Sequence, residues 1–312
     1  MRRLFALIVL SLGLAVVAMP ATVASAHAIL DNSVPASGAT VAESPPQIVF
    51  DFDETVEVSL GFVRLFASDG SRVTLPDPFR DAADASIVRV DAPSLDDGTY
   101  VASYRVVSVD GHPVEGAITF QVGEGPRANV EDVLAGALGD AGIEPAVKSL
   151  SRVVRLAGYL ALALALGSLL FVLSGVVPGL QMRLLHTTTA AAAAVGISAI
   201  ALLCLQGAAS SGEGLGAAVE WSRISAVLDT RVGHALVVRA VIAVALSSAA
   251  FVAVRRRAAT TPVSVRFLGV LAFLVLPLSY AFGGHPAAAS PAAPAVMASV
   301  LHVASAATWF GG

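Results

Sequence analysis

Three residues in the amino-terminal half of the chain, His27, Asp110 and His112, carry side chains that bind metal ions. Asp110 and His112 are two positions apart, so in an extended segment both side chains would leave the same face. With the ring and a freed amine of His27, the set would supply three nitrogens and one oxygen. Cu(II) favours such tetragonal nitrogen and oxygen sites. The alternative is an ordinary turn at Asp110 and Gly111 with His112 solvated, and His27 as an ordinary polar residue at the mouth of a domain.

The amino terminus has the pattern of a secretory signal peptide, predicted to comprise residues 1–26. Arg2 and Arg3 give a basic start, Leu4 to Val17 an apolar run, and Ala24-Ser25-Ala26 a small-x-small cleavage site. Cleavage there would make His27 the new amino terminus and free its amine. The domain that follows would then be exported.

The ligand types in this region discriminate between the two oxidation states of copper. Between residues 27 and 151 the sequence has no Met and no Cys. Soft thioether and thiolate ligands select Cu(I), so their absence and the carboxylate of Asp110 favour Cu(II). The single cysteine, Cys204, lies in an apolar run, so no disulfide framework is available.

The composition divides the chain into a soluble part and a membrane part. Of its 312 residues, 56% are hydrophobic and only 13% are charged, whereas soluble domains carry roughly 25% charged residues. The apolar excess is concentrated in residues 152–312. The net charge of −4 argues against nucleic acid as a partner.

The predicted fold class is an all-β exported domain followed by an all-α polytopic membrane domain. Residues 27–123 contain short strand patterns separated by turn residues, which indicates an Ig-like or cupredoxin-like β-sandwich. The predicted strands are 47–52, 61–66, 86–90, 99–107 and 117–122. Residues 124–151 are glycine-rich, acidic and weakly helical, and are interpreted as a linker that is either a tether or a short amphipathic piece on the membrane.

The membrane domain, residues 152–312, contains apolar stretches of about the 20 residues that span a bilayer. The predicted spans are 153–177, 185–207, 233–254, 265–282 and a fifth that starts near Pro294.

The signal peptide also predicts the orientation, with the β domain outside the plasma (inner) membrane of a multi-pass protein. The loops around Arg183 and Arg255–Arg257 would then be cytoplasmic, in agreement with the positive-inside rule. Lys148, Arg152 and Arg155 would lie on the outer side, against that rule, but the export signal and the arginine triplet outweigh them.

Three histidines of the membrane half, His234, His285 and His302, fall on the outer side in this orientation. Ionisable groups in a membrane are costly and mark functional sites, so these residues are predicted to form a copper path. For His234 and His285 the alternative is plain interfacial polarity. Arg239, inside the third span, is expected either to reach outward or to pair with an acid such as Glu220.

Residues 27–123 combine three features: the exported His27-Ala28, a strand-rich domain, and the segment Val109-Asp110-Gly111-His112-Pro113-Val114-Glu115-Gly116. In these features the domain resembles the CopC family. In that family the amino-terminal His and an Asp-x-His segment bind Cu(II). The resemblance therefore assigns this role to His27, Asp110 and His112. Some members add a Met-rich Cu(I) site, and the absence of Met here implies no transfer between two sites within the domain.

The membrane half resembles CopD, the polytopic partner of CopC, and fusions of the two are a known arrangement. The matching piece is Leu301 to Gly312, which reads LHVASAATWFGG. CopD-like proteins have more spans than the five predicted here, so the membrane domain is expected to be truncated.

The predicted function is capture of Cu(II) by the exported domain and delivery to a histidine site in the membrane helices, for copper transport or resistance and without catalysis. The expected partners are copper, the lipid bilayer and other copper-homeostasis proteins. One alternative is a copper-dependent oxidative enzyme that uses the amino-terminal His. Against it, Asp110 would resist reduction to Cu(I), and a domain of about 100 residues offers little surface for a polymeric substrate. The other is a protein that sequesters or senses copper without transport.

Overall fold

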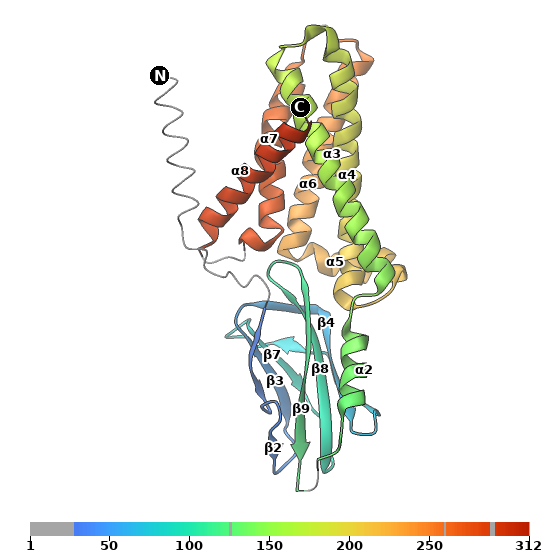
Figure 1. The fold of residues 1–312 in the computed structure, drawn as a ribbon, viewed down its shortest axis with the longest axis vertical. Helices are drawn as coiled ribbons and strands as arrows, with labels where there is room; N and C mark the ends of the chain where they lie inside the picture. Colours follow the sequence, from blue (N-terminus) through green and yellow to red (C-terminus); the bar gives the residue numbers. More distant parts are fainter. Residues whose placement is uncertain (1–27, 125–126, 259, 288–290, 312) are drawn as a thin grey trace.

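The computed structural model describes residues 28–124, 127–258, 260–287 and 291–311. Figure 1 shows a β domain at one end of an elongated molecule and a bundle of long helices at the other. This arrangement confirms the predicted fold class, an all-β domain followed by an all-α membrane domain. The predicted signal peptide and His27 lie outside the described residues.

The β domain consists of two sheets. The first has the strand order β1-β3-β7-β6, with β1 Leu30–Val34, β3 Gln47–Phe52, β7 Ile87–Asp91 and β6 Phe79–Arg80. The second has the order β2-β9-β8-β4-β5, with β2 Thr40–Val41, β9 Pro113–Val122, β8 Gly98–Ser108, β4 Val56–Ala67 and β5 Arg72–Val73. The five predicted strands correspond to β3, β4, β7, β8 and β9. Strands β2, β5 and β6 were not predicted. Each has two residues, too few to leave an alternation pattern in the sequence.

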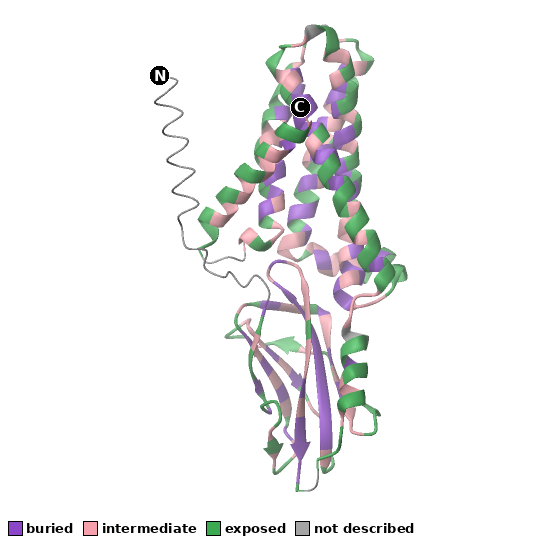
Figure 2. Ribbon diagram, viewed as in Figure 1, coloured by how far each residue is buried: buried purple, intermediate pink, exposed green. Residues whose placement is uncertain are grey.

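The core of the β domain lies between these sheets. In β3 every second residue is buried, and Phe50 and Phe52 both contact Tyr104 of β8, with ring centroids 5.0 and 5.4 Å apart. Such alternation is what a strand with one face on a core requires. Strand β8 differs because nearly all of its residues are buried on both faces (Figure 2). It is therefore the strand that the rest of the molecule covers.

Helix α2, Glu131–Ala141, covers one face of the second sheet by packing against β8 and β9. The segment predicted as a linker therefore contains a helix that belongs to the β domain (Figure 1). The first long helix, α3, begins at Pro145, earlier than the predicted start at residue 153. Pro145 fits the first helical position, and the Glu144 side chain accepts a hydrogen bond from the Val147 amide, which caps the helix.

Among the residues that the structure describes, five helices are long and apolar enough to cross a membrane. They correspond to the five predicted spans: α3 Pro145–Ser174, α4 Gln181–Ser211, α6 Arg231–Arg255, α7 Val263–Phe282 and α8 Ala292–Gly311. Fully buried leucines form the bundle core, and large apolar side chains such as Ile197 and Phe267 remain exposed on its outside. That distribution suits a lipid surrounding. Shorter elements connect the helices: η1 Pro178–Leu180, η2 Leu215–Val219, α5 Trp221–Leu228 and η3 His285–Ala287.

The β domain is packed directly on one end of the bundle. Leu60 of β4, Val107 of β8 and Val227 of α5 form a buried apolar cluster across the junction. Arg105 of β8 is fully buried and donates hydrogen bonds to the carbonyls of Ala209 and Ser210 in the last turn of α4. Those carbonyls have no partner within the helix, so the arginine satisfies them. The junction therefore holds the two domains in one orientation.

Candidate metal centre

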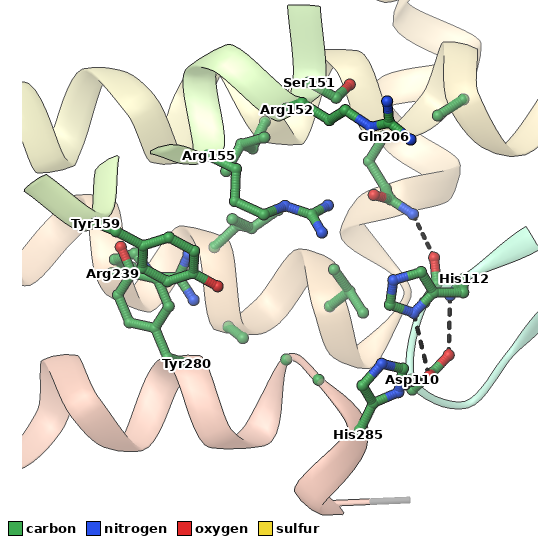
Figure 3. Close-up of a pocket in the computed structure, with 18 of the residues that line it drawn as sticks. Asp110, His112, Ser151, Arg152, Arg155, Tyr159, Gln206, Arg239, Tyr280 and His285 are labelled. Carbon is green, nitrogen blue, oxygen red and sulfur yellow. Dashed lines mark hydrogen bonds and ion pairs between the residues drawn. The ribbon is translucent and has the colours of Figure 1, made fainter. Parts of the chain in front are cut away.

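Asp110, His112 and His285 form a cluster in which one ligand atom from each residue lies within 4.8 Å of the others (Figure 3). The Nδ1 atom of His112 is 3.1 Å from Oδ2 of Asp110, and Nδ1 of His285 pairs with the same oxygen. The two imidazole rings are stacked, with centroids 4.8 Å apart and planes 13° from parallel. The cluster thus joins the hairpin of the β domain to the η3 turn of the membrane domain, and offers one oxygen and two imidazoles to a metal ion.

The Asp110 and His112 side chains converge through a turn, and the extended segment predicted from their spacing was wrong. Strand β8 ends at Ser108, and the hairpin is closed by hydrogen bonds between the backbones of Ser108 and His112 and of Ser108 and Gly111. The Asp110 carboxylate accepts a hydrogen bond from the His112 amide at 3.0 Å. Gly111 has a φ of +85°, in the region that favours glycine. The turn, stabilised by the carboxylate itself, brings the two side chains together.

Asp110 is ionised at neutral pH in this environment. Its burial would raise its pKa, but the hydrogen bonds from the His112 ring and amide, and the nearby His112 and His285, lower the pKa to about 2. The side chains of His112 and His285 are 39% and 50% exposed, so both rings are accessible from solvent. The centre therefore combines a fixed negative charge with two reachable imidazoles.

Two residues of the membrane helices hold the ligand-bearing segments in place. Gln206 of α4 donates a hydrogen bond to the Gly111 carbonyl at 2.6 Å. Arg231, at the start of α6, donates to the carbonyl of Val109 at 3.0 Å and to that of Ala287 at 3.1 Å. Its guanidinium thus links the hairpin that carries Asp110 to the turn that carries His285. Nothing in the sequence distinguishes Gln206 or Arg231, since a polar residue near a helix end has many ordinary roles.

Replacing Arg231 with glutamine is expected to weaken copper binding to the cluster by about 10- to 100-fold, the range for residues that orient metal ligands. The shorter, uncharged side chain would lose the bond to the Val109 carbonyl, which helps to hold the hairpin that carries Asp110 and His112. The measurement is a copper titration of the full chain against a competing chelator. Arg266→Gln, an exposed arginine at the other end of the bundle, is the matched control. An unchanged affinity in Arg231→Gln would contradict this role.

The residue that follows the predicted amino terminus lies near the hairpin. Ala28 is buried, and the Ile29 amide donates a hydrogen bond to the Asp53 carboxylate at 2.7 Å. The next residue, Glu54, accepts a hydrogen bond from the Ser108 hydroxyl, directly before the hairpin. His27 precedes Ile29 by two residues, a reach of about 7 Å in an extended chain. The predicted inclusion of His27 in the site stays a prediction.

The structure does not bring His234 and His302 to this cluster. His234 is exposed near the start of α6, His302 is exposed on α8, and neither lines the cavity beside the cluster. Their place in a copper path stays a prediction. Arg239 neither reaches outward nor pairs with Glu220. It is buried, donates hydrogen bonds to the hydroxyl and carbonyl oxygens of Ser279, and lies over the Tyr280 ring.

Comparison with known families divides the chain at the same place as the fold. The CopC domain matches residues 30–123, and the N-terminal domain of copper resistance protein D-like proteins matches residues 147–295. Asp110 and His112 lie in the first match and His285 in the second, so the candidate metal centre draws on both.

Three similar proteins illustrate these matches. Copper transport protein CutJ of Bacillus subtilis is 28% identical over 92% of this chain and 52% of its own length, so the chain spans about half of that relative. Copper resistance protein C of Xanthomonas campestris pv. juglandis is 37% identical over 36% of this chain and 95% of its own length. The crystal structure of CopC from Methylosinus trichosporium OB3b is 31% identical, covers 33% of this chain and 100% of its own, and has a TM-score of 0.30.

Proposed function

Because this chain belongs to the CopC–CopD family of copper resistance and transport proteins, we propose that its β domain captures Cu(II) and passes it directly to a histidine of the membrane domain. The observation that carries the proposal is the contact of His285 with Asp110 and His112. A ligand from the membrane half already stands within the ligand set of the β domain. Copper could therefore change partners without being released to solvent.

The ligand set supports Cu(II) as the form that is captured. It offers a carboxylate and two imidazoles, and His27 would add its ring and amine. Cu(II) prefers tetragonal sites of nitrogen and oxygen ligands, and the β domain provides no thioether or thiolate. Asp110, ionised at neutral pH, adds a negative charge that favours the divalent ion over the monovalent ion.

Transfer proceeds by ligand exchange in this proposal. Asp110 contacts both histidine rings, so it can remain bound while the amine and ring of His27 give way to His285. The stacked arrangement places the His112 and His285 rings close enough to share one copper ion. His285 replaces one of the two His27 nitrogens, and departure of the second leaves copper with three protein ligands, Asp110, His112 and His285. The cavity behind the cluster leads from it toward the membrane helices.

We place the β domain on the extracytoplasmic side of the plasma membrane. The signal-peptide pattern of residues 1–26 and the arginines at 255–257, at the end of the bundle remote from the β domain, support this orientation. In this orientation, the cluster lies where copper arrives from outside the cell.

The mature amino terminus tests the capture site. We expect mass spectrometry of the membrane-extracted protein to give a chain that begins at His27. Acetylating that amine is expected to weaken Cu(II) binding by about 100-fold or more. The acetylated nitrogen no longer binds the metal, and the His27 ring loses the amine with which it would chelate copper. A protein that retains the residues before His27, or binding that survives acetylation, would exclude His27 from the site. A variant with Ala inserted before His27, whose amine is displaced, is the matched comparison.

A further inference from the structure

A cavity of about 600 Å³ opens behind the metal cluster, between the hairpin of the β domain and the ends of the long helices. Asp110, His112 and His285 lie at one side of it, and Tyr159 and Tyr280 at the other (Figure 3). The two tyrosine rings contact each other, with centroids 5.2 Å apart. The cavity is much larger than a metal ion requires.

The cavity wall carries a large excess of positive charge. Lys148, Arg152, Arg155 and Arg239 line it, while Asp110 is the one carboxylate among the described lining residues. Within the described part of the chain, no carboxylate forms an ion pair with any of these four cations. A bare Cu²⁺ ion would be repelled by such a wall, whereas an anion would be attracted to it.

Arg239 shows most clearly that the charge is not compensated by the protein. Its side chain is buried, at 5% exposure, in the wall of the cavity. Ser279 accepts two hydrogen bonds from it, each at 3.1 Å, and the Tyr280 ring lies 3.5 Å beneath its central carbon. These neutral groups satisfy donors but do not cancel a full charge. Buried charges in proteins are normally paired, so this one indicates a ligand of opposite charge.

Arg155 occupies the space between the two ends of the cavity. In Figure 3 its side chain extends from α3 into the cavity, with the tyrosine pair on one side and His112 on the other. A guanidinium in this place can bind a carboxylate through two parallel hydrogen bonds. An anion held there would lie next to the metal cluster.

We propose that the cavity binds a small organic anion with two or more carboxylate groups, held by Arg155 and Arg239, which supplies an oxygen ligand to copper on Asp110, His112 and His285. The copper part of this inference rests on the proposed function. Three side chains leave a position open on a tetragonal Cu(II) ion, and a carboxylate oxygen suits that position. Copper would then enter the membrane domain as an anionic complex, which the positive wall attracts.

The anion site is tested on the full chain without metal, in nanodiscs of zwitterionic lipid so that no lipid supplies a net negative charge. Citrate is the probe, and isothermal titration calorimetry measures its binding. We expect Arg155→Gln to weaken citrate binding by about tenfold or more, the factor for losing a charge-assisted hydrogen bond. Arg155 is exposed, so this variant is expected to fold. Arg183→Gln, an exposed arginine at the opposite end of α4, should bind citrate as the parent does.

Three outcomes would overturn the inference. They are no citrate binding by the metal-free protein, equal binding by Arg155→Gln and the parent, and inorganic phosphate binding as tightly as citrate. Pulsed electron paramagnetic resonance of the copper-loaded protein tests the ligation. With ¹³C-labelled citrate, coupling to copper is expected, and its absence would exclude direct contact. The two proposals can fail separately. If Asp110→Asn bound copper as tightly as the parent while the protein still bound citrate, the proposed function would be contradicted and the anion site would stand.

Discussion

Replacing Asp110 with asparagine is expected to lower the Cu(II) affinity of the full chain by about 100-fold or more, beyond the roughly 10- to 100-fold loss seen when a residue that only supports a metal ligand is replaced. The substitution keeps the size of the side chain but removes the negative charge that contacts both His112 and His285. It keeps the amide oxygen that can accept the hydrogen bond from the His112 backbone. The turn should therefore persist while the ligand is lost.

Competition against a chelator of known copper affinity measures this effect. Asp69→Asn is the matched control, because Asp69 also accepts a hydrogen bond from the amide two residues later, in the turn before β5. Hydrogen exchange at residues 108–112 reports whether the hairpin of Asp110→Asn is intact. An intact hairpin with unchanged copper affinity would remove Asp110 from the ligand set, and the proposed capture site with it.

Replacing His285 with alanine is expected to abolish copper accumulation by cells that produce the protein, while copper is still captured. His285 is the histidine of the membrane domain that the structure places in the cluster, so its loss removes the recipient ligand. Asp110 and His112 come from the β domain and remain. The capture affinity should therefore change by less than about tenfold, or 1.4 kcal/mol.

Cellular copper content and copper titration of the purified chain separate transfer from capture. His234→Ala and His302→Ala serve as comparisons, because both side chains are exposed away from the cluster. A loss of accumulation in either would extend the copper path beyond His285, as the sequence predicted. Full accumulation in His285→Ala would exclude direct transfer through this residue. If the parent itself did not raise cellular copper, the proposed inward transfer of copper would be excluded.

Much of the architecture could be predicted because it depends on local patterns. Alternation of apolar residues located β3, and long apolar runs located all five long helices. Strand β8 was found as well, but burial on both of its faces was not expected. That burial depends on α2 and on the helix ends packing against the second sheet, contacts between segments that no short window of sequence contains.

The metal cluster, too, was predicted only in part from local sequence. The residue types alone were sufficient to select Asp110 and His112 as a pair, since a carboxylate and an imidazole close in the chain can share a metal ion. The route by which they meet was wrong, because a turn at Gly111, and not an extended strand, brings them together. For His285, 173 positions after His112 in the printed sequence, neither spacing nor composition indicated a shared site.

What made His285 a third ligand is the packing of the β domain on the bundle. Arg105 and the apolar cluster around Val227 fix that packing, and Arg231 links the hairpin to the turn that carries His285. The sequence was sufficient to predict an exported β domain with candidate copper ligands and a membrane domain with three histidines on the same side. Only the tertiary structure selected one of those histidines and exposed the positive cavity beside it. Charges and ligands from distant segments acquire a joint function through the three-dimensional contacts that bring them within a few ångströms of one another.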